Sequence, residues 1–273
     1  MRRLIRLSGI ASLLLGAMLL LPSPAGAASH SPSTLSRGPA HLIGRRLGHA
    51  INNDTVTSTN WGGYAVQSAS QFTDVKGTWV EPSVTCPSHS SQYAAFWVGI
   101  DGYSSNSVEQ IGTDSDCNGK NKPSYYAWYE MYPAASVSLS TSQYPVKPGD
   151  TLSAEVSVSG SQFTLSISSS EGWSFSTTQT GSGLAQSSAE WIAESPELCR
   201  AHRCSLAQLA DYGSVGFTSA EAAAGGTDQP ISAFTADGGP HEIICETSSG
   251  VVREQPSALG SGGDNFTITW EHD

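Results

Sequence analysis

Short segments in which polar and apolar side chains alternate constrain this chain most strongly. They recur from Ser58 to Asp273 between turns rich in Gly, Ser, Pro and Asn, and good helical periodicity is scarce. A period of two is the pattern of β-strands. The clearest cases are 77–84, 93–100, 124–133, 150–160, 162–169, 172–178 and 264–273. We therefore predict one all-β domain, a β-sandwich of two packed antiparallel sheets, spanning residues 54–273.

Two stretches of the chain fit a helix better than a strand. In 205–213, Leu206 and Leu209 fall on one helical face, and Gly213 follows as a stop signal. The stretch 218–226 is a weaker case. We expect a short helix at the first of these positions.

The first residues have the features of an export signal. Three arginines within the first six residues precede an apolar run at 13–21, and small residues precede a cleavage point after Ala27. This pattern predicts a signal peptide at 1–27 and a secreted, extracellular protein. No later stretch approaches the length of a membrane span.

Charge is distributed unevenly along the chain. All 24 acidic residues lie in 54–273 with only seven of the 13 basic residues, which gives this part a formal charge of −17. Such a surface repels nucleic acid and anionic membranes, so neither is an expected partner, and we expect a monomer. Residues 28–53 contain Arg and His but no acid. They form either a linker or a basic pro-segment that inhibits the acidic domain until acid weakens their attraction.

Five cysteines follow the signal, and an exported chain favours disulfides. Cys199 and Cys204 bracket a short loop and are expected to pair. Cys86 with Cys117 is a possible second disulfide, which leaves Cys245 as a free buried thiol.

Two possible metal sites are weak. His202 lies between two cysteines but has no evident fourth ligand. The stretch 114–119, DSDCNG, matches half of a calcium loop, but Tyr125 stands where a glutamate is needed. We expect a turn there, and we predict neither a metal nor a cofactor.

The alternation also indicates which side chains share a sheet face. Glu130 falls with Tyr126, Trp128 and Tyr132, Glu190 falls with Ile192 and Glu194, and Gln110 falls opposite to Glu109. A face that is both aromatic and acidic suggests a binding groove. The alternative is that the aromatic rings fill the core and the acids lie at strand ends.

Several chemistries lack their motifs. The chain has no G-x-S-x-G, no H-E-x-x-H, no phosphate-binding loop and no dinucleotide glycine pattern. Carboxylate chemistry remains, with three possibilities. These are a glycoside hydrolase with two carboxylates, a lectin-like module that only binds, and a peptidase whose carboxylate activates water.

Six strings in the chain occur in a familiar order. They are NWGGYAV (60–66), WVGIDG (97–102), VEQIGTD (108–114), YYAWYEMYPA (125–134), KPGDTLSAEV (147–156) and AEWIAE (189–194). With PSALGSGGDNFTITW (256–270), they resemble the landmarks of the glutamic peptidases of family G1, the eqolisins. The resemblance extends in patches from Thr59 to Trp270.

This resemblance implies a sandwich of the lectin and glucanase type, made with a signal and a pro-segment. It also implies hydrolysis of protein or peptide substrates at acid pH without metal or cofactor. The family's catalytic glutamine and glutamate fall on Gln110 and Glu194. Groove and support positions fall on Trp61, Asp101, Asp114, Trp128 and Glu130, and Glu190 is assigned to support from its place on the same face. Met131, where relatives often carry an aromatic residue, is expected to change packing only.

The chemistry of the two side chains agrees with this assignment. The Glu194 carboxylate would take a proton from the attacking water and return it to the departing amine. Gln110 would donate its amide N–H to the oxyanion, and it stays neutral at low pH.

Overall fold

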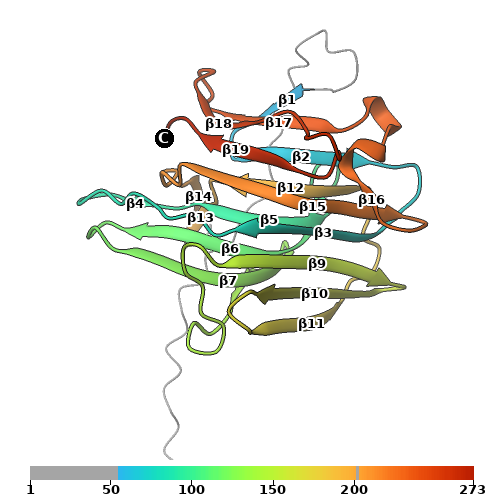
Figure 1. Ribbon diagram of the computed structural model, residues 1–273, viewed down its shortest axis with the longest axis horizontal. Coiled ribbons are helices and arrows are strands. Elements are labelled where there is room, and N and C mark those ends of the chain that lie inside the picture. Colours follow the sequence, from blue (N-terminus) through green and yellow to red (C-terminus); the bar gives the residue numbers. More distant parts are fainter. Residues whose placement is uncertain (1–54, 201–202) are drawn as a thin grey trace, which may run out of the picture. The chain divides into compact units, whose positions relative to one another are not determined.

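The computed structural model describes residues 55–200 and 203–273 (Figure 1). The predicted signal peptide at 1–27, the segment 28–53 and His202 lie outside these residues. Within the described ranges, no helix combines the length and apolar character needed to cross a membrane.

The described chain forms two layers of strands, and the predicted β-sandwich is confirmed. The first layer runs in the order β1 (Thr55–Ser58), β17 (His241–Glu246), β2 (Trp61–Gln67), β12 (Ser188–Glu194), β5 (Ala95–Ile100), β6 (Val108–Asn118), β7 (Pro123–Tyr132) and β8 (Val137–Ser138). The second layer runs β18 (Val252–Pro256), β19 (Phe266–Trp270), β15 (Ser214–Ala224), β3 (Phe72–Val80), β9 (Thr151–Ser159), β10 (Gln162–Ser169) and β11 (Ser174–Thr180). Every pair within these layers is antiparallel except β1 with β17, and the hairpin β17–β18 joins the layers.

Smaller elements lie at the margins of the two layers. They are β4 (Ser91–Gln92) beside β6, β16 (Gln229–Pro230) beside β15, the separate hairpin β13 (Glu197–Arg200) and β14 (Arg203–Leu206), and the 3-10 turns Ile231–Ala233 and Ala236–Gly238.

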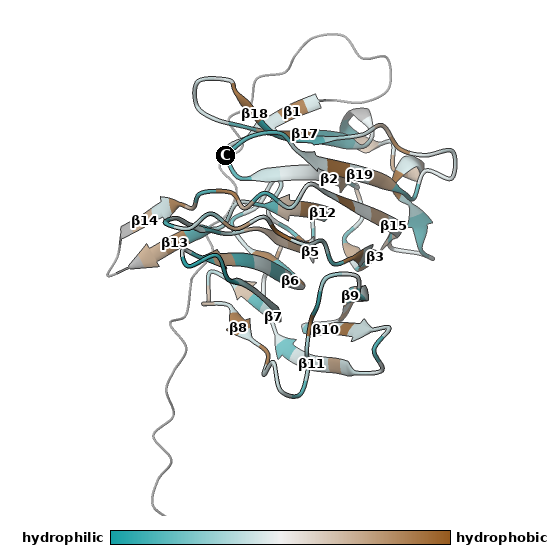
Figure 2. Ribbon diagram, turned by 60° about the vertical axis from the view of Figure 1, so that its left-hand side comes forward, coloured by the Kyte–Doolittle hydropathy of each residue, from teal (hydrophilic) through white to brown (hydrophobic). Residues whose placement is uncertain are grey.

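Alternation along each strand sends one set of side chains into the space between the layers. Phe96, Val98 and Ile100 of β5 and Trp191 of β12 belong to this main core, together with Trp79 of β3. The colour changes along single strands in Figure 2 follow the same alternation. The main core therefore leaves the other face of the first layer free for different side chains.

The expected helix at 205–213 is wrong. Leu209 forms a bridge with Tyr93, whose N–H donates to the carbonyl of Gln208 at 2.9 Å, so this stretch is extended. Leu209 is fully buried while Leu206 is 39% exposed, so the two leucines do not share a buried face. Pairing with a distant segment outweighs the local pattern.

The weaker helix candidate at 218–226 is wrong as well. It belongs largely to β15, which pairs with β3 through a register shift between Thr218 and Glu221. Ala220 and Ala222 of this strand are completely buried in the main core.

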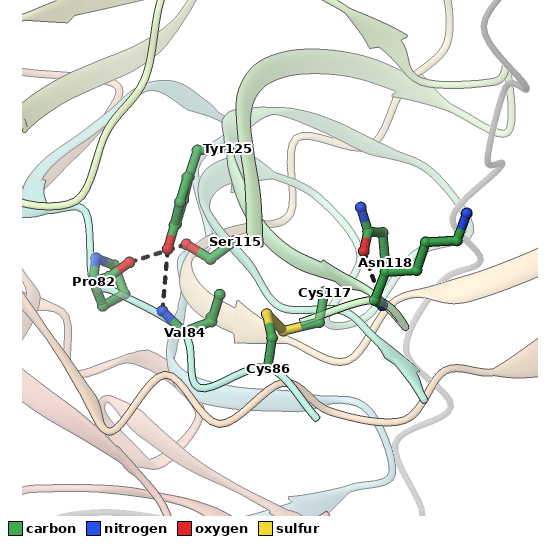
Figure 3. Close-up of a disulfide and its surroundings, with 8 residues drawn as sticks. Pro82, Val84, Cys86, Ser115, Cys117, Asn118 and Tyr125 are labelled. Atoms are coloured by element: carbon green, nitrogen blue, oxygen red, sulfur yellow. Dashed lines mark hydrogen bonds between the residues drawn. A yellow bond between two sulfur atoms is a disulfide. The ribbon is translucent and has the colours of Figure 1, made fainter. Parts of the chain in front are cut away.

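The cysteine predictions agree with the structure. Cys86 is bonded to Cys117 and Cys199 to Cys204, and Cys245 is a buried free thiol. Figure 3 shows the first disulfide, which ties the segment after β3 to the end of β6. The expected turn at 114–119 is only partly correct, because β6 continues to Asn118 before the chain turns.

Three glutamates are buried in the sandwich, and the sequence predicted no ion pair for them. Burial raises the pKa of Glu81, Glu109 and Glu254 to about 8. Glu81 is held by the hydroxyl groups of Thr113 at 2.6 Å and Ser115 at 2.7 Å. These carboxyl groups are therefore neutral in the folded protein at acid pH.

We predict that the protein is most stable in acid. The pKa of the Glu81 carboxyl group is about 8 in the folded protein and 4.5 in the unfolded chain. Its contribution to the free energy of unfolding is therefore complete below pH 4.5 and is lost as the pH rises toward 8, because the unfolded chain ionises first. The melting temperature should decrease as the pH is raised from 4.5 to 8. Glu81→Gln, which cannot ionise, should reduce this loss of stability by about 2 kcal/mol or more at pH 8.

Calorimetry across this pH range checks the prediction, with Glu171→Gln on the exposed surface as control. Equal slopes in the parent and Glu81→Gln would contradict the prediction.

Candidate active site

The outer face of the first layer carries a second apolar cluster, which we name the aromatic face. Its buried members are Val56, Trp61, Ala65, Ala95, Trp97, Val108, Trp128, Ile192 and Ile243. Glutamate, aspartate and glutamine side chains project from the same face between them. The predicted grouping of aromatic and acidic side chains on one face is thus present, and the aromatic rings named there are not part of the main core.

Strand register arranges this face in transverse rows. The first row contains Trp61, Glu194, Ala95, Asp114 and Tyr126, on β2, β12, β5, β6 and β7 in turn. The next contains Ile192, Trp97, Gly112 and Trp128, and the third contains Ala65, Glu190, Gly99, Gln110 and Glu130. The residues predicted for the site, except Asp101, therefore lie on one face, although they come from four strands, β2, β12, β6 and β7.

Glu194 ends β12 and is 1% exposed. The indole N–H of Trp97 donates to its Oε2 at 2.8 Å, and Asn60 Nδ2 donates to its Oε1 at 3.5 Å. Donors aimed at both oxygens favour the ionised form of a buried carboxyl group. Glu194 is therefore a buried carboxyl group with a hydrogen-bond donor at each oxygen, inside an aromatic environment.

The turn before β2 fixes the Asn60 amide. Ser58 Oγ donates to Asn60 Oδ1 at 3.1 Å and accepts from the backbone N–H of Trp61 at 3.1 Å. The carbonyl of Asn60 also accepts the backbone N–H of Ser195 at 2.8 Å. Asn60 is thus bound to the strand of Glu194 by both its side chain and its backbone.

Gln110 is 3% exposed and held by its neighbour in the row. Its Nε2 donates to Glu130 Oε2 at 2.7 Å. This bond uses one of the two amide N–H groups and leaves the second as a donor. Its Oε1 accepts no hydrogen bond from the described part of the chain. Glu130 therefore fixes the orientation of the carboxamide.

Trp97 stands between Glu194 and Gln110. Glu194 is opposite Ala95 and Gln110 is opposite Gly99, four residues along β5. On a flat sheet this offset would separate their Cα atoms by roughly 16 Å. The Trp97 indole lies between their two rows, so the Glu194 and Gln110 side chains leave the sheet on the face that carries this ring.

The segment after β5 lies close to the Trp61 ring. A Cβ there would lie 2.8 Å from Cη2 of Trp61, which belongs to the row of Glu194. Trp61 also packs edge-to-face on Trp97, with the ring centroids 4.9 Å apart. The segment after β5 therefore folds back over the aromatic face.

Glu190 and Asp101 play different parts from that of Glu194. Burial, followed by the nearby carboxyl groups of Asp101 and Glu109, raises the pKa of Glu190 well above its usual value. Its Oε1 accepts the backbone N–H of Tyr103 at 3.3 Å. Asp101 instead caps the start of β12, since it accepts the N–H of Gln186 at 2.7 Å and of Ser187 at 2.8 Å. Glu190 is a neutral group at acid pH, and Asp101 is a support of the backbone.

The far end of the first row is acidic. The Tyr126 hydroxyl donates to Asp114 Oδ2 at 2.5 Å and lies 3.1 Å from Asp116 Oδ2. Trp128, fully buried, lies one row further along the same strand. The structure thus places Asp114 and Trp128 on the aromatic face, two rows and one row from Gln110 respectively.

Candidate metal ligands are few within 55–200 and 203–273. The grouping found there, Glu197 with Cys199 and Cys204, contains two cysteines already joined in a disulfide. A disulfide has no thiolate to offer a metal ion.

The fold and the site define a class of protein, a β-sandwich that places a carboxyl group and a carboxamide on one aromatic sheet face. The sequence pattern of the peptidase A4 family matches residues 59–262. Aspergillopepsin-2 from Aspergillus niger is 31% identical over 246 residues, with 78% of each chain covered. The chain therefore belongs to the peptidase A4 family, the G1 or eqolisin peptidases, and is a glutamic endopeptidase.

Solved structures agree with the fold. Scytalido-glutamic peptidase, bound to a transition-state analogue inhibitor, superposes with a TM-score of 0.67 at 24% identity. SCP-B, an eqolisin bound to the tripeptide Ala-Ile-His, superposes with a TM-score of 0.62 at 23% identity. Each comparison covers 78% of this chain and 98% of the other.

Sequence reasoning did not identify two of the partners of Glu194. Asn60 and Trp97 both lie in strings that mark the family, NWGG and WVGID, but the period of a strand gives no hint of their contact with Glu194. Tyr126 was placed on the correct face, without its link to Asp114. The available signal was that both residues are polar or aromatic members of family motifs.

We predict that Trp97→Phe lowers kcat by about 10- to 100-fold at acid pH, because a hydrogen bond to a charged group is lost while the ring remains. KM should change by less than about threefold. Steady-state hydrolysis of a peptide substrate measures both. Trp173→Phe is a matched control, since its indole N–H donates to the Pro145 carbonyl away from the aromatic face. An unchanged kcat in Trp97→Phe would exclude a role for this donor.

Proposed function

We propose that this glutamic endopeptidase is secreted and cuts proteins in acid with Glu194 and Gln110 as its catalytic pair. One observation carries the proposal. A carboxyl group and a carboxamide lie on one sheet face, in the rows on either side of Trp97, and each is oriented by a partner of its own.

Glu194 is the general base in this proposal. Its carboxylate takes a proton from a water molecule, whose oxygen attacks the carbonyl carbon of the peptide bond. The carboxylic acid then formed gives the proton to the departing nitrogen, and the C–N bond breaks. Trp97 and Asn60 hold both oxygens of Glu194, which limits the positions from which it can reach the water.

Gln110 stabilises the oxyanion. Its bond to Glu130 leaves one N–H to face the carbonyl oxygen as negative charge develops there. A carboxamide remains a donor at any acid pH, whereas a carboxylic acid donates only while protonated. An amide in this position therefore suits an enzyme that works where carboxyl groups titrate.

Acid operation fits the rest of the domain. The neutral form of Glu190 keeps a second negative charge away from Glu194 at low pH, and its ionisation would add that charge. The buried acids of the sandwich also favour the folded state in acid.

The parts of the chain outside the domain complete the proposal. Residues 1–27 would direct secretion, and 28–53, a segment with basic residues and no acid, would act as an inhibitory pro-segment of a monomeric zymogen. Opposite charge on the segment and the domain supports this. The substrates are proteins or peptides, in keeping with the peptide ligand of SCP-B.

We predict that Glu194→Gln lowers kcat by about 10³-fold or more, because no base remains. Gln110→Ala should lower it by about 10²- to 10³-fold through loss of the oxyanion donor. Cleavage of a denatured protein near pH 4, followed by mass spectrometry of new amino termini, measures both variants.

Glu190→Gln is the decisive control. Glu190 and Gln110 lie in the same row, and only Gly99 stands between them. Glu190 is therefore the competing candidate for the base. Because it is already neutral in acid, Glu190→Gln should keep kcat within about threefold of the parent. Activity that survives in Glu194→Gln and is lost in Glu190→Gln would move the base to Glu190.

A further inference from the structure

Arg253 is a buried cation that contacts the segments next to the candidate base. It lies in β18 and is 3% exposed, the only buried Lys or Arg among the residues whose side chains the structure describes. A buried charge is costly unless it is paired and its donors are satisfied. The partners of Arg253 therefore indicate what it holds in place.

Two backbone carbonyls and one carboxylate surround the guanidinium. Nη1 donates to the carbonyl of Thr59 at 3.3 Å, and Nη2 donates to the carbonyl of Ala207 at 3.4 Å. Nη2 also lies 3.3 Å from Asp273 Oδ1. A planar fork can bridge several acceptors in this way, whereas a lysine ammonium cannot match its geometry.

Both carbonyls belong to segments that flank Glu194. Thr59 precedes Asn60, whose amide reaches the Glu194 carboxylate. Ala207 O also accepts the hydroxyl of Ser195, the residue after Glu194, at 2.9 Å. The backbone on both sides of the carboxylate–amide contact is thus joined through one side chain.

Asp273 holds the guanidinium from the other side. Its Oδ1 accepts the backbone N–H of Leu209 at 2.7 Å, and its Oδ2 accepts Gln92 Nε2 at 3.4 Å. The backbone N–H of Glu271 donates to the Arg253 carbonyl at 2.8 Å. The carboxylate is therefore itself fixed.

We propose that Arg253, held by Asp273, is a positioning residue for Glu194. It fixes the Thr59–Asn60 turn and the Ser195 end of β12 relative to each other, so that the Asn60 amide stays aimed at the carboxylate. This inference rests on the proposed role of Glu194. Arg253 touches no substrate and takes no part in proton transfer.

The test compares kcat, KM and melting temperature at acid pH in Asp273→Asn, Arg253→Lys and Arg253→Ala. Both conservative variants should lower kcat by about tenfold, with KM changed by less than about threefold. Lys76→Met removes an ion pair with Glu221 on the second layer and should leave kcat unchanged. Arg253→Ala should lose more activity and recover part of it when guanidinium chloride is added at tens of millimolar, but not with equal sodium chloride.

The outcomes separate this proposal from the assignment of the base. If Asp273→Asn and Arg253→Lys keep the parental kcat while their melting temperatures fall, Arg253 only stabilises the fold and the proposal is overturned. If Arg253→Ala does not fold, these two variants still decide. If Glu194→Gln is active, the catalytic assignment fails first, whatever the Arg253 variants show.

Discussion

Strand β12 lies between β2 and β5 and is buried on both faces, so its carboxyl groups depend on hydrogen-bond donors from these strands and the segments next to them. Glu194 obtains them from Trp97 and Asn60, whereas Glu190 has the Tyr103 backbone and is largely neutral in acid. One strand therefore carries two glutamates of different character four residues apart. The difference between the two glutamates follows from the hydrogen-bond donors that the adjoining segments present to each of them.

The sandwich and the aromatic face could be predicted from alternation alone, because a period of two fixes both strand type and facing. The helix expected at 205–213 failed because Leu209 pairs with Tyr93 from a distant part of the chain. The contacts of Glu194 could not be predicted for the same reason. Trp97 and Asn60 lie 97 and 134 residues away in sequence, and only the strand order β2–β12–β5 brings them beside it.

Neutral carboxyl groups connect stability with chemistry in this domain. Glu81 and Glu254 lie in the interior and Glu190 on the aromatic face, and burial favours the protonated form of each. The conditions that keep the sandwich folded are therefore those in which Glu194 faces the fewest competing negative charges. Burial of these carboxyl groups thus favours the folded state in acid, the condition that we propose for the reaction.

The central claim is that Glu194 and Gln110 act on the same peptide bond. Their register partners on β5, Ala95 and Gly99, are four positions apart. A crystal structure with a peptide analogue of the tetrahedral intermediate tests it most directly. The account predicts one oxygen of the tetrahedral centre within about 3 Å of the Glu194 carboxylate and the other within about 3 Å of Gln110 Nε2. An analogue whose tetrahedral centre contacts Glu190 in place of Glu194, or reaches only one member of the pair, would contradict it.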